Sequence, residues 1–127
     1  MRVTVAICTW NRCGLLRQTL EALTRASRPA TVDFELLVVN NNCTDATDEV
    51  IGEFVGRLPL RRVFESRPGL SHAGNAALAE ASGDYIVFTD DDVLVDASWL
   101  VELKAAARVY PAAAAVGGII DPWFPEE

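Results

Sequence analysis

The sequence lacks any apolar run long enough to cross a membrane, and it lacks the cysteine and histidine spacing of a metal site. A membrane-spanning helix needs about 18–20 apolar residues in succession. Three cysteines, Cys8, Cys13 and Cys43, form an odd number without C-x-x-C spacing. They argue against a zinc site or a disulfide framework and indicate reduced thiols. Residues 1–8 are too short for a signal-peptide core and predict a first strand. These features predict a cytoplasmic protein.

Positive charge is also scarce, with 11 lysines and arginines against 18 aspartates and glutamates and a formal net charge of −7. Proteins that bind DNA or RNA usually carry a basic face, so we expect no nucleic-acid partner. An acidic protein that binds a phosphate group needs a charge to offset the repulsion, and a divalent cation would supply it. The 127 residues, half of them hydrophobic, fit one domain with one core.

Strand and helix patterns alternate along the whole chain. Short apolar runs predict strands at residues 3–8, 34–39, 60–64, 85–89 and 113–120. The first helical pattern places Leu16, Leu20 and Leu23 on one face, and further helical patterns cover residues 50–58, 70–81 and about 96–110. Repeated strand–helix units of this length predict an α/β fold, a mostly parallel Rossmann-like sheet with helices on both faces.

Several polar residues and one glycine are predicted to set the helix ends. Asn11 and Asp96 are placed to cap the helices that follow them. Asp45 is placed to stabilise the first turn of its helix. Gly83 follows the third helical pattern and predicts its C-terminal stop.

Polar or aromatic residues follow each of the first four predicted strands. In an open α/β sheet, ligands bind beyond the carboxyl ends of the strands, so we expect these segments to form one site. The segments are Thr9-Trp10-Asn11-Arg12, residues 40–45, Arg67-Pro68-Gly69 and Asp90-Asp91-Asp92.

The aspartate cluster is the sharpest of these signals. Residues i and i+2 of an extended segment point to the same side, so Asp90 and Asp92 are expected to face one ion and Asp91 another way. Carboxylate oxygens suit Mg²⁺ or Mn²⁺, which also accept oxygen ligands from water and substrate phosphates. The alternative interpretation is a solvated acidic turn at the start of the next helix.

The other segments offer groups that could contact a nucleotide. Trp10 could pack on a nucleobase, or it could be a packing residue at the edge of the site. Arg12 could reach a phosphate. Asn40 has a donor and an acceptor for a base edge, although the run of asparagines is also typical of a turn.

Four segments in order resemble the family 2 glycosyltransferases of the GT-A fold. The family's T-x-N-R-like opening matches residues 8–12, and its V-D-N-G-S-T-D-x-T pattern matches residues 39–47. Its G-x-s-x-A-R-N-x-G-i segment matches residues 69–78, and G-D-Y-I-x-F-x-D-x-D matches residues 83–92. The resemblance covers essentially the whole chain. It implies that residues 1–127 are one nucleotide-sugar-binding domain, the N-terminal half of an enzyme, truncated before its acceptor-binding half.

The resemblance also implies roles for single residues. Thr9 and Asn40 would line the base pocket, and Asp91 would lie against the ribose or the donor sugar. Asp92 would ligate the metal, Mg²⁺ or Mn²⁺, with support from Asp90. The nucleotide-sugar-binding residues predicted in this way are Thr9, Trp10, Asn11, Arg12, Asn40, Asn42, Arg67, Gly69, Asn75, Asp90 and Asp91.

Two positions depart from the family pattern. Asn40 stands where the family usually has an aspartate that accepts a hydrogen bond from uracil, and Gly74 stands where an arginine is common. Arg12 or Arg67 could supply the missing positive charge. The family's general base lies in the acceptor half and is expected beyond residue 127.

The implied activity is transfer of a sugar, with inversion, from a nucleoside diphosphate to a carbohydrate or lipid-linked acceptor. A UDP-sugar is the favoured donor. The alternative is a non-catalytic nucleotide-sugar-binding module completed by a partner domain or chain. Association with a second copy, and contact of the missing region with the cytoplasmic face of a membrane, are further expectations.

Two other α/β classes fit less well. A receiver-like phosphoacceptor domain expects an acidic pair after its first strand and a lysine after its last, where this sequence has Thr9-Trp10 and Asp121-Pro122. A sugar nucleotidyltransferase would open with a glycine-rich loop and an arginine, and no such loop follows Cys8.

Overall fold

The computed structural model describes residues 2–26, 33–118 and 120–122. Within these residues the strands β1 (Arg2–Thr9), β2 (Asp33–Asn40), β3 (Leu60–Phe64) and β4 (Tyr85–Asp90) form one sheet. All neighbouring pairs are parallel and the strand order is β3-β2-β1-β4. The helices α1 (Cys13–Arg25), α2 (Thr47–Phe54), α3 (Leu70–Glu80) and α4 (Trp99–Val109) alternate with the strands. The predicted α/β class and the first four strands are confirmed.

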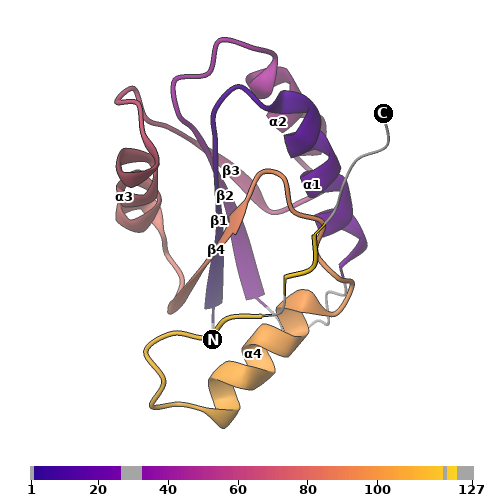
Figure 1. Ribbon diagram of the computed structural model, residues 1–127, viewed down its shortest axis with the longest axis vertical. Helices are drawn as coiled ribbons and strands as arrows, with labels where there is room; N and C mark the ends of the chain where they lie inside the picture. The colour runs from indigo at the N-terminus through magenta and orange to yellow at the C-terminus, as the bar shows by residue number, and fades with distance from the viewer. Residues whose placement is uncertain (1, 27–32, 119, 123–127) are drawn as a thin grey trace.

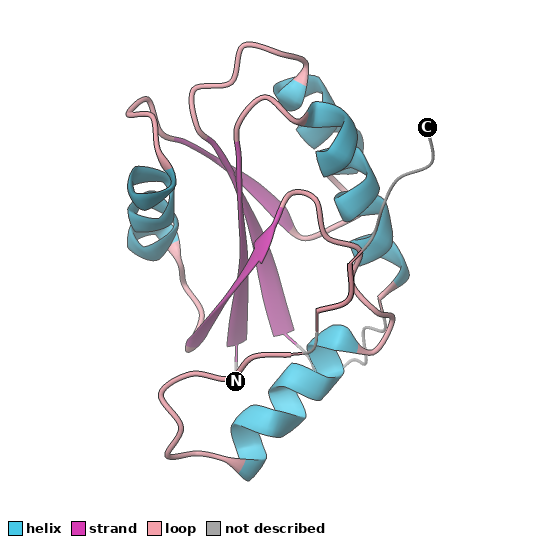
Figure 2. Cartoon of the chain, in the orientation of Figure 1, coloured by secondary structure: helices cyan, strands magenta, loops and turns pink. Residues whose placement is uncertain are grey.

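The helices cover both faces of the sheet, with α1 and α2 on one side and α3 on the other (Figure 1, Figure 2). The larger cluster of buried residues joins the predicted apolar face of α1 to α2, to Leu100 of α4 and to β1 and β2. On the opposite face, Ala73 and Ala77 of α3 pack against Ala6 and Val39. The prediction of helices on both faces of the sheet, made from the alternating strand–helix pattern, is therefore confirmed. No helix within the described ranges combines the length and apolarity needed to cross a membrane.

The central strands and the edge strand differ in how well they are covered. In β1 and β2 nearly every side chain is buried, as expected for parallel strands with helices on both faces. In β4, Tyr85 is 44% exposed and Phe88 is 52% exposed. The apolar Tyr-Ile-Val-Phe run predicts a buried strand here, and this prediction is wrong because β4 lies at the edge of the described sheet.

The predicted fifth strand at residues 113–120 is not formed within the described residues 113–118 and 120. These residues lie exposed, with Val116 44% and Ile120 91% accessible. The segment opens with three alanines and ends near Gly117 and Gly118, residue types that are depleted in strands. Apolar composition alone suggested the strand, and neither propensity nor a packed neighbour supports it.

Three predicted helix ends also need correction. Asn11 does not cap α1, because Arg12 occupies the N-cap position and Asn11 adopts φ 50°, in the left-handed region. Asp96 lies outside α4 as well, and its carboxylate accepts hydrogen bonds from the backbone and hydroxyl of Ser98 in the preceding turn. Gly83 is not the residue that ends α3, because that helix has Ala81 as its C-cap.

Gly83 has a packing role instead. A Cβ atom at this position would lie 2.6 Å from the backbone nitrogen of Thr4, which no side chain could occupy without movement of the backbone. The Gly83 amide also donates a hydrogen bond to Thr4 Oγ1. The glycine therefore lets the turn before β4 lie directly against β1.

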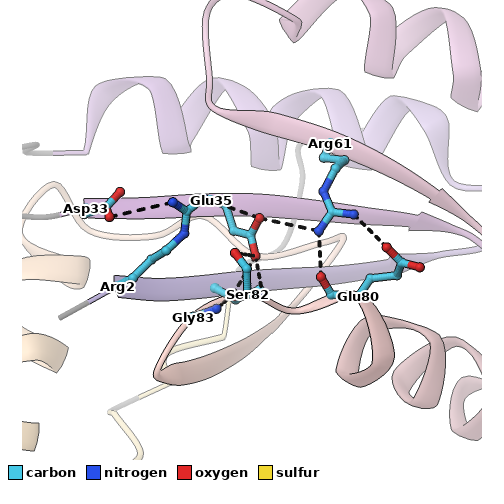
Figure 3. A network of polar contacts seen from close by, with 8 residues as sticks. Arg2, Asp33, Glu35, Arg61, Glu80, Ser82 and Gly83 are labelled. Atoms are coloured by element: carbon cyan, nitrogen blue, oxygen red, sulfur yellow. Dashed lines mark hydrogen bonds and ion pairs between the residues drawn. The ribbon is translucent and has the colours of Figure 1, made fainter.

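A buried carboxylate ties the amino ends of the strands together (Figure 3). Glu35 Oε1 accepts hydrogen bonds of 2.8 Å from Thr4 Oγ1 and from both the backbone and the hydroxyl of Ser82. Its Oε2 lies 3.7 Å from Arg2 and 3.5 Å from Arg61. Burial alone would raise the pKa of Glu35, but the Ser82 and Thr4 hydrogen bonds and the charge of Arg61 outweigh it and lower the pKa to about 2. We call these five residues the Glu35 network.

Candidate functional site

A cavity of about 530 Å³ opens where β1 and β4 end, at the opposite end of the strands from the Glu35 network. Seven of the predicted site residues line it, namely Thr9, Trp10, Arg12, Gly69, Asp90, Asp91 and Asp92. The remaining lining residues are Cys8, Asn41, Pro68, Leu70 and Ala73. Asn41 and Pro68 belong to segments that the sequence places at the site, but none of the five is among the residues predicted to contact the nucleotide sugar. The end of β1, the end of β4 and the start of α3 thus meet at one concave surface, as the position of the polar segments predicts.

The three aspartates, which we call the acidic turn, occupy different environments. β4 ends at Asp90, and Asp91 and Asp92 lie in the turn that follows, so strand alternation governs only the first of them. Asp91 is 6% exposed and accepts a 2.8 Å hydrogen bond from Thr9 Oγ1. Burial raises the pKa of the Asp91 carboxyl, although the Thr9 hydrogen bond and the charge of Arg12 act in the opposite direction. Asp91 is therefore fixed to β1, while Asp90 and Asp92 stay accessible.

Arg12 supplies the positive charge closest to the acidic turn. Its Nη1 lies 3.3 Å from Asp92 Oδ2 and 3.5 Å from Asp91 Oδ1. The Asp90 carboxylate has no hydrogen-bond or ion-pair partner among residues 2–26, 33–118 and 120–122. The cavity thus contains one accessible cation, one accessible carboxylate paired with it and one accessible carboxylate that is unpaired.

Asn41 holds the part of the cavity wall that includes Gly69. Its Nδ2 donates hydrogen bonds to the carbonyl oxygens of Glu65 (3.1 Å) and Arg67 (2.7 Å), and its Oδ1 accepts one from the Gly69 amide (3.1 Å). Gly69 itself adopts φ 119°, a conformation that favours glycine. One buried amide therefore fixes the whole segment 65–69. The position of Asn41 directly after β2 is a sequence signal for this role, although the predicted base contact is its neighbour Asn40.

Asn40 lies outside the cavity lining, and both ends of its side-chain amide form hydrogen bonds within the protein. Its Oδ1 accepts a 2.8 Å hydrogen bond from the Cys43 amide, and its Nδ2 donates one of 2.8 Å to Asp48 Oδ1. Arg62 binds both oxygens of Asp48 at 2.8 and 3.1 Å. The Arg62 and Asn40 hydrogen bonds lower the pKa of Asp48. The amide thus completes a chain of contacts between β2, α2 and β3.

Four further predicted residues do not line the cavity. Asn11 exchanges hydrogen bonds with Thr44, and Asn42 is exposed in a turn at φ 58°. The Arg67 side chain pairs with Glu65 at 2.7 Å. Asn75 is exposed on α3. The turn interpretation of the asparagine run therefore describes Asn42, whereas Asn41 contributes to the cavity wall.

Asp45 shows why the loops after β1 and β2 stay together. Its Oδ1 accepts a hydrogen bond from the amide of Thr47, the first residue of α2, which confirms its predicted role. Its Oδ2 accepts a second hydrogen bond from the amide of Cys13, the first residue of α1. One carboxylate therefore joins the starts of both helices beside the site.

Cys8 is the thiol that lines the cavity. Burial raises its pKa to about 11, and the negative charges of Asp90 and Asp91 contribute in the same direction. The thiol is therefore protonated at neutral pH, which makes it a poor nucleophile.

The donor set at the acidic turn fits a hard divalent cation. Within the described residues, no three acidic, cysteine or histidine side chains converge into a complete metal site. Mg²⁺ typically takes one or two protein carboxylates and fills its shell with water and substrate phosphates. Asp90 and Asp92, both accessible from the cavity, meet that requirement.

The model of the family described as "Glycosyl transferase family 2" matches residues 4–122. The succinoglycan biosynthesis protein ExoM of Rhizobium meliloti is 26% identical over 121 residues, 94% of this chain and 39% of that protein. Validoxylamine A glucosyltransferase of Streptomyces hygroscopicus subsp. jinggangensis is 34% identical over 116 residues, 90% of this chain and 27% of that protein. The chain therefore spans about two-fifths or less of the length of these curated relatives.

Solved GT-A glycosyltransferase structures resemble the chain in three dimensions. S. aureus TarS 1-349, in complex with UDP, has a TM-score of 0.79 and 25% identity, over 87% of this chain and 33% of that chain. The mannosyltransferase PcManGT of Pyrobaculum calidifontis, in complex with GDP-Man and Mn²⁺, has a TM-score of 0.73 and 32% identity, over 91% of this chain and 33% of that chain.

Proposed function

The chain belongs to glycosyl transferase family 2, and from this premise we propose that it is the donor-binding part of an enzyme that transfers a sugar from a nucleoside diphosphate to an acceptor hydroxyl. The observation that carries the proposal is the cavity itself. It combines two accessible carboxylates, an accessible arginine and a buried Thr9–Asp91 pair at the carboxyl ends of parallel strands. The relatives that bind UDP or GDP-Man support this type of donor.

Each group of the cavity has a proposed task. The diphosphate gains negative charge as the bond to the sugar breaks, and a divalent metal held by Asp92 and Asp90 would stabilise that charge. Arg12 binds a phosphate oxygen through its guanidinium. Asp91, oriented by Thr9, accepts a hydrogen bond from a hydroxyl of the ribose or of the donor sugar. Trp10, 60% exposed at the cavity, is placed to pack against the base.

The nucleobase is the least constrained part of the donor. Because the Asn40 amide is engaged by Cys43 and Asp48, we assign the polar wall of the base pocket to the segment that Asn41 fixes. A UDP-sugar stays the favoured donor. TarS in complex with UDP supports this choice, whereas PcManGT binds GDP-Man, so GDP is the nucleotide to compare with UDP.

The general base is proposed to lie outside these 127 residues. Among the described residues, the acidic side chains that line the cavity are those of the acidic turn, and all three already have proposed tasks. Transfer with inversion needs a base that deprotonates the acceptor hydroxyl. We therefore expect this chain to bind the donor with little or no transfer, as one domain that precedes an acceptor-binding half.

The same observation supports the second candidate, a non-catalytic nucleotide-sugar-binding module completed by a partner domain or chain. A carbohydrate or lipid-linked acceptor, a second copy of the chain, and a location in the cytoplasm or at the cytoplasmic face of a membrane all stay predictions. Hydrolysis or transfer of the sugar by a longer form of the protein would favour the enzyme over the binding module.

Isothermal titration with UDP and GDP, each with and without Mn²⁺, tests the proposal. We expect UDP to bind with Mn²⁺, and Asp92→Asn to weaken that binding by at least about tenfold, because even outer-shell changes at metal sites cost 10- to 100-fold. Asp33→Asn is the matched control, since Asp33 is exposed at the amino end of β2. If neither nucleotide binds in the presence of Mn²⁺, the proposed function is wrong.

A further inference from the structure

Arg12 contacts Asp92, one of the two carboxylates that would hold a metal ion. A single guanidinium nitrogen, Nη1, lies within 3.5 Å of both Asp91 Oδ1 and Asp92 Oδ2. Asp90, the other accessible carboxylate of the acidic turn, has no partner among the described residues. Arg12 therefore occupies part of the space and neutralises part of the charge that a cation bound to Asp92 would use.

We propose that Arg12 is a placeholder cation, which competes with the metal for Asp92 when no nucleotide is bound and turns to the diphosphate when one is. The inference rests on the proposed function and adds an order of assembly to it. A metal ion alone must displace Arg12 from Asp92 and stay beside its positive charge. A nucleotide diphosphate gives the guanidinium a new anionic partner, so that metal and nucleotide strengthen each other's binding.

The geometry of the pair is suited to such an exchange. The Arg12 side chain is 53% exposed, and its contacts of 3.3 and 3.5 Å are long for charge-assisted hydrogen bonds. Exposed ion pairs of this kind contribute little free energy, so they break easily. By contrast, Arg17 in the α1 helix holds Glu53 with two hydrogen bonds of 2.9 and 3.0 Å.

Only the side chain needs to move. The Arg12 carbonyl oxygen accepts a 2.9 Å hydrogen bond from the Leu16 amide and so forms the first turn of α1. Leu16 is fully buried in the core. The backbone of Arg12 is therefore anchored, while its guanidinium reaches from a fixed point to either the carboxylates or a ligand in the cavity.

A permanent structural pair would behave differently. If Arg12 served only to neutralise the acidic turn, its removal would leave the carboxylates repelling one another and would loosen the turn. The lost charge would then change Mn²⁺ binding by the same factor with and without UDP. The placeholder role predicts instead that removal of Arg12 strengthens Mn²⁺ binding only when UDP is absent, because the guanidinium then no longer competes for Asp92.

The test is a set of Mn²⁺ titrations, followed by the electron paramagnetic resonance signal of free Mn²⁺, with and without UDP. We expect Arg12→Gln to bind Mn²⁺ alone roughly tenfold more tightly than the unmodified chain, within the 5- to 150-fold range typical of coupling between sites. The same variant should bind UDP more weakly and lose most of the mutual strengthening between Mn²⁺ and UDP. Arg12→Lys, which keeps the charge, should lie closer to the unmodified chain.

Arg25→Gln is the matched control, because it removes the same charge from the last turn of α1, at the far end from Arg12, and should change neither titration. Far-UV circular dichroism shows whether the variants are folded. If Arg12→Gln is not folded, the comparison of Arg12→Lys with the unmodified chain still tests the role of the guanidinium. Unchanged or weaker Mn²⁺ binding by Arg12→Gln, or full retention of the coupling, would overturn the placeholder role alone. Failure of the unmodified chain to bind UDP with Mn²⁺ would overturn the proposed function as well.

Discussion

Replacing Glu35 with glutamine removes the buried carboxylate at the centre of the network in Figure 3 while keeping an oxygen for Thr4 and Ser82. The carboxylate pKa is lowered from an ordinary 4.5 to about 2. A shift of that size corresponds to about 3 kcal/mol of folding free energy when the group is ionised. Because Glu35 is only 7% exposed, solvent screening takes little from this value. We therefore expect Glu35→Gln to lower the free energy of unfolding by about 2–3 kcal/mol at pH 7.

The pH dependence distinguishes charge from packing. The folded-state pKa lies below the unfolded-state value, so the stabilisation is complete above about pH 5 and is lost as the pH falls from about 4.5 towards 2. Urea unfolding of both proteins at pH 7, 4.5 and 3 measures this directly, and the difference between them should shrink towards pH 3. Glu53→Gln, at an exposed pair with Arg17, is the control and should cost much less than Glu35→Gln at every pH. A Glu35→Gln cost that is equal at pH 7 and pH 3 would refute the reasoning.

Two further substitutions test close contacts in the core of the fold. Asn40→Asp should destabilise the chain by about 1–3 kcal/mol, because it replaces a donor to Asp48 with a second carboxylate, and Asp48→Asn in the same chain should restore part of the loss in urea unfolding. Gly83→Ala should lower the thermal midpoint by an amount equivalent to about 1–3 kcal/mol, since its Cβ would meet the backbone nitrogen of Thr4. Gly52→Ala is the control and should not lower the midpoint, because the space around Gly52 is open. Equal midpoints for the two variants would contradict the packing role of Gly83.

The sequence predicts the layers of this fold well because they depend on local periodicity. The spacing of Leu16, Leu20 and Leu23 specifies the buried face of α1, and short apolar runs specify the first four strands. Strand ends in turn place Thr9 and Asp90 at one edge of the sheet, and the cavity lies there. The run at 113–120 fails because apolar composition without strand propensity or a packed neighbour does not form a strand.

The fine structure of the site depends on contacts that no local pattern contains. Adjacent asparagines, Asn40 and Asn41, have the same chemistry, yet one bonds to Asp48 and the other to the segment that ends at Gly69. Which of the two faces the cavity follows from the path of the loop after β3, more than 20 residues further along the chain. The Glu35 network likewise joins residues from four separate segments, so its existence could not be read from spacing.

The Glu35 network and the cavity lie at opposite ends of the same parallel strands, and this separation has a consequence for protein engineering. Pro68 and Leu70 line one wall of the cavity and contribute no hydrogen bond or ion pair to Glu35, so we expect their substitution to leave the Glu35 network in place. A library of variants at these two positions could therefore be screened for altered donor choice, with little expected loss in the free energy of unfolding. In such a library the residues at the amino ends of the strands would be kept unchanged, and the substitutions would be confined to the cavity at the carboxyl ends.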